Sequence, residues 1–371
     1  MRNSYCNDKM AHKNIQSPTD TKIPQSVLRF GAEQFDAGDS FTILVLLVLV
    51  IGAMFLRLDK VNRFTEKQIT ETVIAKVTAP PVLIKEGHQT TQLVEQLKTA
   101  GLWDLPDHGE VPMIIVDSYP IDFHILENIE LRKRIFLHTL LPTALLARHE
   151  VAMERLGLQS ILAKINCSPD LINFTSSSSG TQQCLWQNYL AADEMNFVKD
   201  LCRTYRTTNA KELLARVDSL PVSLILAQGA LETSWGRSRF AREGNSIFGM
   251  WTWNSKGMVP LQREKGKTHK VKAYDSILDS VRAYQLTLNR LDHYEHLRNL
   301  RLETHDSLIL ADGLALYSQR GNEYVNDIKN VILSNNLQSY DQLILKDFEG
   351  GFTGEDFFKI NRTRQAANAS L

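Results

Sequence analysis

One uninterrupted apolar run, Phe41–Leu56, constrains this chain more than any other feature of its sequence. The run reads FTILVLLVLVIGAMFL and is bounded by Asp39 and Arg57. A helix that crosses a bilayer usually has about 18 or more apolar residues, so this run is slightly short. A buried core helix is the alternative, but it would need a large core directly around it because no side of the run is polar. We therefore predict a transmembrane helix over residues 41–56.

We expect this segment to be retained as an uncleaved, single-pass signal anchor. No clear small-x-small cleavage site lies before Arg57, where Ile51, Gly52 and Ala53 are the nearest candidates. The preceding residues 1–40 are polar and lack periodicity, which is typical of a disordered tail. We place this tail in the cytoplasm.

The basic residues around the apolar run favour the opposite orientation. Arg29 is the only basic residue close upstream, whereas four follow directly downstream: Arg57, Lys60, Arg63 and Lys67. The positive-inside rule alone would leave the C-terminal part in the cytoplasm. We override the rule on the functional grounds given below, and the conflict between the two arguments stays open.

The overall composition excludes one broad class of function. Hydrophobic residues make up 43% and charged residues 23% of the 371 residues, which is typical of a globular protein. The 42 Lys and Arg residues balance the 42 Asp and Glu residues, and no basic stripe is evident. Nucleic-acid binding normally needs such an excess or stripe, so we expect no nucleic-acid partner.

The sequence also predicts no metal ion and no other cofactor. The four cysteines contain no C-x-x-C pair, and neither an H-E-x-x-H motif nor a nucleotide-binding glycine motif occurs. Cys167 and Cys184 could form a disulfide in an oxidising compartment, or they could be free structural thiols. The sequence does not decide between these two states.

The chemistry-bearing residues concentrate between Leu220 and Asn254. Glu232 follows Gln228 by four residues and Leu224 by eight on a predicted helix, so the three share one helix face. The apolar neighbours of this acid in the sequence are Leu231, Trp235 and Phe248. Because desolvation disfavours the charged carboxylate, we expect a raised pKa for Glu232, as a general acid requires.

A loop that suits a ligand follows this acid. Gly236, Gly244 and Gly249, with Asn245, would let the backbone approach a ligand closely. Trp251 and Trp253 offer flat apolar faces on which sugar rings could stack. The alternative is that Glu232 is an exposed helix carboxylate and that the tryptophans belong to the core. For any one of these residues taken alone, we would prefer this alternative. Three of the five tryptophans lie within about twenty residues of the same acid, which favours a binding site.

The run ALETSWGRSRFAREGNSIFG resembles the signature of the glucosaminidase family. Four further stretches narrow the resemblance to one bacterial branch of that family: Arg132–Pro142, Met258–Pro260, Asp275–Arg282 and Gly313–Tyr324. The resemblance covers roughly residues 82–340. It implies a mainly α (α+β) lysozyme-like fold, in which a small β-hairpin forms one wall of a saccharide cleft. Residues Met258–Gln262 and His269–Tyr274 flank the polar turn of the expected hairpin.

The resemblance also implies an activity, which is hydrolysis of the β-1,4 bond on the reducing side of N-acetylglucosamine in murein. Glu232 would be the general acid, and Tyr317 would be the tyrosine beside it, with Tyr324 as the second choice. Both tyrosines could instead be helix-packing residues. The expected substrate-binding residues are Gln228, Trp235, Asn245, Phe248, Trp251, Trp253 and Tyr324.

The second catalytic group departs from the family pattern. Related enzymes often place a carboxylate on the hairpin strand, but here that strand reads His269–Lys272. Glu264, in the hairpin turn, is the nearest substitute. Without a second carboxylate, the positive charge that develops on the sugar would be stabilised by the acetamido oxygen of the substrate or by a water held by Tyr317. We favour the acetamido route because it needs no second acid.

These expectations divide the chain into six parts and leave two other functions open. The parts are a tail (1–40), an anchor (41–56), a linker and accessory segment (57–120), a helical accessory region (121–215), the catalytic domain (216–345) and a flexible tail (346–371). The expected partners are peptidoglycan strands and the bacterial inner membrane. The alternatives are a murein-binding scaffold without activity, which the missing hairpin acid favours, and a murein amidase, for which no zinc-ligand set is visible.

The orientation predicts a topology experiment. Murein lies outside the cytoplasm, so we expect residues 57–371 in the periplasm. Alkaline phosphatase fused after Leu371 should therefore be active, and a reporter that needs the cytoplasm should be inactive at the same position. The reverse pattern would support the charge rule and remove the enzyme from its substrate.

Overall fold

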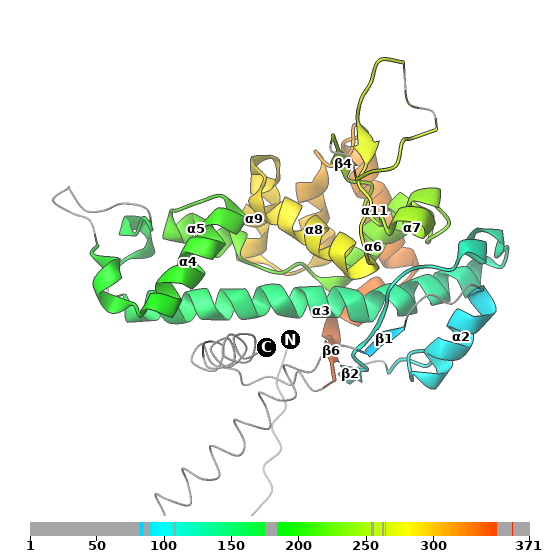
Figure 1. The fold of residues 1–371 in the computed structure, drawn as a ribbon, viewed down its shortest axis with the longest axis horizontal. Coiled ribbons are helices and arrows are strands. Elements are labelled where there is room, and N and C mark those ends of the chain that lie inside the picture. Colours follow the sequence, from blue (N-terminus) through cyan, green and yellow to red (C-terminus); the bar gives the residue numbers. More distant parts are fainter. Residues whose placement is uncertain are drawn as a thin grey trace, which may run out of the picture. The chain divides into compact units, whose positions relative to one another are not determined.

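The computed structural model describes residues 82–84 (backbone only), 89–106, 109–165, 167–174, 184–253, 256–261, 263, 265–346 and 358 (Figure 1). All of them belong to one compact unit, Thr70–Leu371. The predicted tail and anchor, residues 1–56, and the candidate Glu264 lie outside the described residues. None of the helices in the described ranges combines the length and the apolar character needed to span a bilayer.

The described part is mainly helical, as predicted. Its α-helices are α2 (Thr90–Thr99), α3 (Ile129–Lys164), α4 (Ala192–Tyr205), α5 (Ala210–Arg216), α6 (Val222–Thr233), α7 (Arg239–Gly244), α8 (Ile277–Arg290), α9 (Glu295–Glu303), α10 (Ser307–Leu310) and α11 (Asn322–Ser334). Its 3-10 helices are η1 (Ile121–Ile125), η2 (Pro169–Leu171), η3 (Trp186–Tyr189), η4 (Asp292–Tyr294), η5 (Ala311–Leu314) and η6 (Leu337–Gln342). Its strands are β1 (Val82–Ile84), β2 (Gly109–Val111), β3 (Ile114–Val116), β4 (Trp251–Thr252), β5 (Lys270–Val271) and β6 (Leu343–Leu345).

Helix α3 is the element around which the others pack. It begins where the Asn128 side chain accepts a hydrogen bond from the Leu131 amide at 3.0 Å. At 1.5 Å per residue its 36 residues extend over roughly 54 Å. Helices α6 and α8 lie on one side of it, and α2 and β6 lie on the other (Figure 1). The helix lies within residues 121–215, the region that the sequence predicted to be helical.

Two hydrophobic cores share this helix. The first core buries Phe136 and Leu140 of α3 together with residues of α6, α8 and α11. The second core buries Leu158 and Ile161, near the other end of α3, together with residues of α4 and α5. The predicted boundary between residues 215 and 216 therefore crosses the first core. Phe358, within the predicted flexible tail, is buried in the second core and packs edge-on against Phe197.

The structure settles the pairing that the sequence left open. Cys167 and Cys184 form a disulfide with a Cα–Cα distance of 6.2 Å, and Cys202 is a buried free thiol. The bridge joins two residues that pack against the second core.

A buried charge cluster joins α9, α8 and the segment between α5 and α6. Arg301 of α9 is only 2% exposed, and its Nη1 donates to Asn289 Oδ1 at 2.8 Å. Its Nε lies 3.6 Å from the Asp218 carboxylate, whose backbone carbonyl accepts from the Asn289 side chain at 2.9 Å. A buried guanidinium is tolerated only when it is paired and hydrogen-bonded in this way.

The small antiparallel sheet differs from the predicted hairpin. The arm around Val271 is confirmed, but β5 pairs with β4, so that Trp251 faces Val271 and Thr252 faces Lys270. Met258, which the prediction placed in the partner strand, does pair with Val271, in an isolated antiparallel bridge with backbone hydrogen bonds of 2.7 and 2.9 Å. A Cβ at Gly257 would lie 2.8 Å from Thr252 Cγ2 and 2.9 Å from Lys270 Cβ, so glycine lets the chain pass close to both strands.

The packing of η5 on α9 generates a stability prediction. A Cβ at Gly313 would lie 2.4 Å from the Leu297 Cα atom, which belongs to the backbone and has nowhere to move. Gly313→Ala should therefore lower the free energy of unfolding by about 1–3 kcal/mol, measured by denaturant titration. Leu316→Ala, at a side chain that is 68% exposed, is the control and should change it by less than about 0.5 kcal/mol. Equal stability of the two variants would contradict the close contact.

Candidate active site

Glu232 lies at the partly exposed end of a helix that is otherwise buried. Residues Val222–Ala230 of α6 are buried, whereas Leu231 and Glu232 in its last turn are partly exposed. Pro221 precedes the first turn, where a missing backbone donor does no harm. The apolar sequence of α6 therefore inserts the helix into the core and leaves one carboxylate at its C-terminal end.

Close packing of α6 on α3 sets the position of that carboxylate. A Cβ at Gly229 would lie 3.0 Å from both Leu140 Cδ2 and Ile247 Cγ2. A side chain at this position would press on both neighbours, so glycine suits the close packing of α6 on α3 at the turn before Glu232.

The residues after Glu232 form a tight left-handed turn. Ser234, Trp235 and Gly236 have φ values of 51°, 59° and 79°. The Thr233 hydroxyl fastens this turn, because it accepts from the Gly236 amide at 2.8 Å and donates to the Gly229 carbonyl at 2.6 Å. The motif E-T-S-W-G therefore ends α6 abruptly, and two non-glycine residues adopt a conformation that L-residues rarely adopt.

Trp235, a predicted substrate-binding residue, packs against α3. Its ring contacts Phe136 edge-on at a centroid distance of 5.8 Å, and Lys133 Nζ lies 5.3 Å from the ring centroid. The side chain is partly exposed, so a role in binding stays a prediction beside this packing role.

The environment of Glu232 favours its protonated form. Burial raises the pKa of this carboxyl above its ordinary value of 4.5, while a hydrogen bond from Tyr324 lowers it by a smaller amount. In that bond the Tyr324 hydroxyl donates to Glu232 Oε1 at 2.7 Å. The predicted desolvation of the acid is therefore present, although the neighbour that contacts it directly is a tyrosine hydroxyl.

A chain of buried hydrogen bonds continues behind Tyr324. Gln228 is fully buried, and its Nε2 donates to the Tyr324 hydroxyl oxygen at 2.9 Å. The Tyr284 hydroxyl donates to the other side of the amide, Gln228 Oε1. A neutral tyrosine has a single proton to donate. Because the Tyr324 oxygen accepts from Gln228, its proton is directed to Glu232.

The two candidate tyrosines have different tasks from those predicted. Tyr317 was the first choice beside the acid, but its hydroxyl donates to the Phe248 backbone carbonyl at 2.7 Å. Its ring stacks on that of Tyr324, with centroids 5.6 Å apart and an interplanar angle of 8°. Tyr324, the second choice, is the tyrosine that contacts Glu232. Spacing along the chain could not separate the two, because both rings belong to one stack.

The loop after α7 brings backbone close to the acid. Gly249 has a φ of 59°, and a Cβ there would lie 3.5 Å from Glu232 Oε2. Asn245 Nδ2 lies 3.3 Å from the Tyr274 and Asp275 carbonyls, so this side chain fastens the loop. Phe248 is buried, and its ring stacks on Tyr284 at 3.9 Å, which makes it a core residue.

Two tryptophans have exposed rings, one in β4 and one directly after it. The side chains of Trp251 and Trp253 are 57% and 68% exposed, so the alternative that places them in the core is wrong. The Trp251 ring stacks on His269 at 4.5 Å with an interplanar angle of 21°. Exposed flat rings of this kind are suited to stacking on the apolar face of a sugar.

The second half of a two-carboxylate mechanism is not provided by the β5 strand. This strand carries Lys270, and Lys272 follows it with its Nζ 4.9 Å from the Tyr274 ring centroid. Among the residues that the structure describes, no group of three or more His, Cys, Asp or Glu side chains is arranged to hold a metal ion.

Comparisons with known proteins relate part of this chain to one family. Residues 207–337 match the glucosaminidase family model, described as mannosyl-glycoprotein endo-beta-N-acetylglucosaminidase. The chain is 29% identical over 155 residues to protein bax of Escherichia coli strain K12, a match that covers 38% of this chain and 55% of that protein. The chain thus spans about half the length of this relative.

A solved structure, the catalytic domain of the autolysin Auto from Listeria monocytogenes, matches 45% of this chain and 91% of its own at 22% identity and a TM-score of 0.28. The family match covers the acid, its tyrosine and the loop between them. Residues 207–337 therefore form a glucosaminidase-family domain, and the chain resembles the Bax-type members of that family.

Proposed function

We propose that this protein is an endo-β-N-acetylglucosaminidase that cleaves the β-1,4 bond on the reducing side of N-acetylglucosamine in murein. Glu232 is its general acid. The observation that carries the proposal is the placement of this acid, with a raised pKa, at the exposed end of a buried helix in a glucosaminidase-family domain. The lysozyme-like cleft, with Trp251 and Trp253 on one wall, belongs to the same proposal.

The hydrogen-bond chain indicates which oxygen of Glu232 delivers the proton. Oε1 accepts from Tyr324, so the acidic proton belongs on Oε2. Oε2 faces Gly249, where the absence of a side chain leaves room for the glycosidic oxygen. Glu232 then transfers its proton to that oxygen while the bond from the oxygen to the anomeric carbon breaks.

The positive charge that develops on the sugar needs stabilisation from a second group. Tyr317 was one candidate for holding a water, but its proton is directed to the Phe248 carbonyl. We therefore keep the substrate's own acetamido oxygen as the second group. This oxygen bonds to the anomeric carbon, and a water later opens the resulting ring and returns a proton to Glu232. Glu264, the other candidate, lies outside the described residues.

We further propose that the domain works in the periplasm, held to the inner membrane by residues 41–56. The Cys167–Cys184 disulfide supports this location, because such bridges persist in oxidising compartments and are rare in the cytoplasm. A murein-binding scaffold that lacks activity is the second candidate, and the lysines around β5 are the observation that favours it.

Replacement of the acid tests the enzyme against the scaffold. Glu232→Gln should lower the rate of murein hydrolysis by on the order of 10²–10⁴, because it removes the proton donor and little volume. Mass spectrometry of the digests should show new reducing N-acetylglucosamine ends with the wild type only. Wild-type turnover by the variant would contradict the assignment, and release of free peptides without new reducing ends would indicate an amidase.

The same variant separates catalysis from folding. The pKa of Glu232 in the folded protein lies above 4.5, so ionisation of the wild-type acid removes stability as the pH rises past that value. Glu232→Gln should therefore have a Tm equal to or above that of the wild type at neutral pH. The difference should disappear when the pH falls below about 4.5.

The tyrosine beside the acid generates a pH prediction. Tyr324→Phe removes the bond that stabilises the carboxylate, so the pKa of Glu232 should rise further. A general acid works only while protonated, and the alkaline limb of the kcat profile should move to higher pH. Tyr119→Phe, which removes another buried hydroxyl, is the control and should leave the limb in place. A shift to lower pH, or none, would contradict the role of Tyr324.

A further inference from the structure

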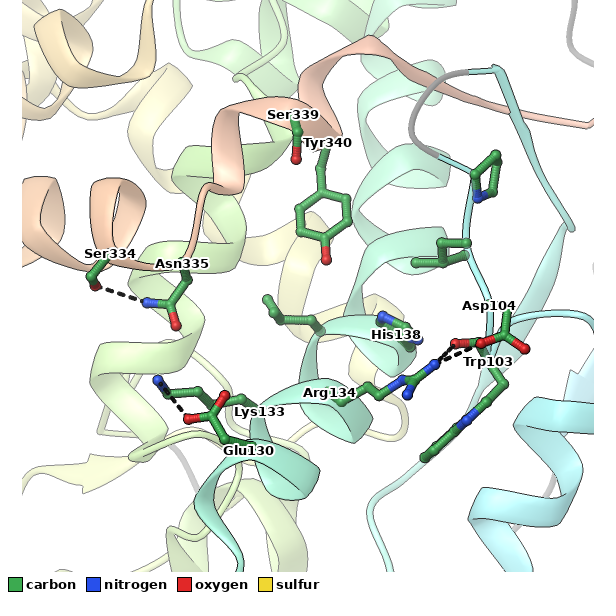
Figure 2. Close-up of a pocket in the computed structure, with 13 residues that line it drawn as sticks. Trp103, Asp104, Glu130, Lys133, Arg134, His138, Ser334, Asn335, Ser339 and Tyr340 are labelled. Carbon is green, nitrogen blue, oxygen red and sulfur yellow. Dashed lines mark hydrogen bonds and ion pairs between the residues drawn. The ribbon is translucent and has the colours of Figure 1, made fainter.

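A concavity lies apart from the hydrogen-bonded groups around Glu232. It has a volume of about 700 Å³ and is bounded by the first turns of α3, the segment after α2, and the chain from the end of α11 into η6. Figure 2 shows residues from all three segments around the same space, among them Trp103, His138, Asn335 and Tyr340. A volume of this size falls in the range of about 300–1,000 Å³ that is typical of ligand sites.

The walls of this pocket present both signs of charge. Lys133 Nζ lies 3.5 Å from Glu130 Oε1 on one side. On the other side Arg134 Nη2 lies 2.7 Å from Asp104 Oδ1 and donates to the Trp103 carbonyl at 2.8 Å (Figure 2). The Arg134 guanidinium is held 4.3 Å from the Trp103 ring centroid, so its position is fixed before a ligand arrives.

His138 places a buried imidazole ring in the wall of this pocket. The side chain is only 8% exposed and lines the pocket, and its Nδ1 makes no hydrogen bond within the described residues. Burial, with a smaller effect of the nearby Arg134, lowers the pKa of His138 to about 4, so the ring is neutral at physiological pH.

Two elements connect this pocket to the acid. Lys133 of the pocket wall lies over the ring of Trp235, which follows Glu232 by three residues. Helix α11 carries Tyr324 beside the acid and ends at Ser334, which lines the pocket. Ten residues separate Tyr324 from Ser334 along that helix, which corresponds to roughly 15 Å.

We propose that this pocket binds the peptide stem of murein, an inference that rests on the proposed murein substrate. The sugar on the reducing side of the cleaved bond is N-acetylmuramic acid, which carries a short peptide with carboxylates and a free amino group. Four or five extended residues reach about 15 Å, which matches the separation along α11. The cations Lys133 and Arg134 suit the peptide carboxylates, and Glu130 and Asp104 suit its amine.

The proposal makes the peptide part of the recognised substrate. The neutral His138 ring, the Asn335 side-chain oxygen and the Tyr340 hydroxyl offer hydrogen bonds to peptide groups (Figure 2). The enzyme should therefore prefer glycan strands that carry their peptides over strands from which an amidase has removed them.

The test uses the full-length protein in mild detergent with these two substrates. The wild type should cut peptide-bearing strands with a kcat/KM at least tenfold above that for stripped strands. Ser334→Trp, which fills the pocket from its rim, should lower the kcat/KM for peptide-bearing strands to the kcat/KM for stripped strands. The kcat/KM for stripped strands should not change. Leu333→Trp, on the exposed face of the same helix, is the matched control and should change neither. Equal wild-type rates on both substrates would overturn the proposal.

Binding of the isolated stem peptide gives a readout that does not depend on catalysis. Glu232→Gln protein should bind a synthetic stem tetrapeptide in calorimetry. The added change Ser334→Trp should abolish binding, and Tyr340→Phe should weaken it threefold or more. Failure of the peptide to bind would overturn the pocket assignment even if murein is cut. Peptide binding without hydrolysis of either strand would instead contradict the proposed glycosidase.

Discussion

The close approach of α6 to α3 at Gly229 is the contact on which the site depends. Gly229 lies against Leu140 of α3 and Ile247 of the loop after α7. Both segments therefore pack directly on α6 at this residue. Ile247 begins the loop that carries Gly249 over the acid, and Leu140 belongs to the helix that both cores share. Gly229 therefore lets the helix that carries Glu232, the loop above this residue and α3 pack closely together.

The side chains that form the hydrogen-bond chain ending at Glu232 are uncharged. Gln228 and Tyr284 are buried and mutually satisfied, so they stabilise one direction of the hydrogen-bond chain that ends on Glu232. A cation in the place of Tyr324 would have stabilised the carboxylate far more and would have kept the acid ionised. The buried amide and hydroxyls instead orient the carboxyl group while burial still dominates its pKa.

The sequence predicted correctly the features that depend on local pattern. It did not predict the contacts between segments that are far apart along the chain. The apolar spacing around Glu232 predicted a buried helix with one acid, and the structure has both. Tyr317 and Tyr324 were ranked in the wrong order for contact with the acid, because their spacing does not say which hydroxyl turns toward α6. The predicted hairpin was right for the pairing of Met258 with Val271 and missed the pairing of β5 with β4, which a hairpin pattern does not encode. The pocket lined by Trp103 and Tyr340 was missed because these residues are far apart along the chain.

The shared helix α3 has a consequence for how this protein loses its structure. Phe136 belongs to one core and Ile161 to the other, and an unbroken helix joins them. Neither core can melt without exposing part of α3 and removing support from its neighbour. The two cores should therefore unfold in one cooperative transition, and damage at the disulfide-bearing end would be transmitted along the helix to the turn that holds the acid.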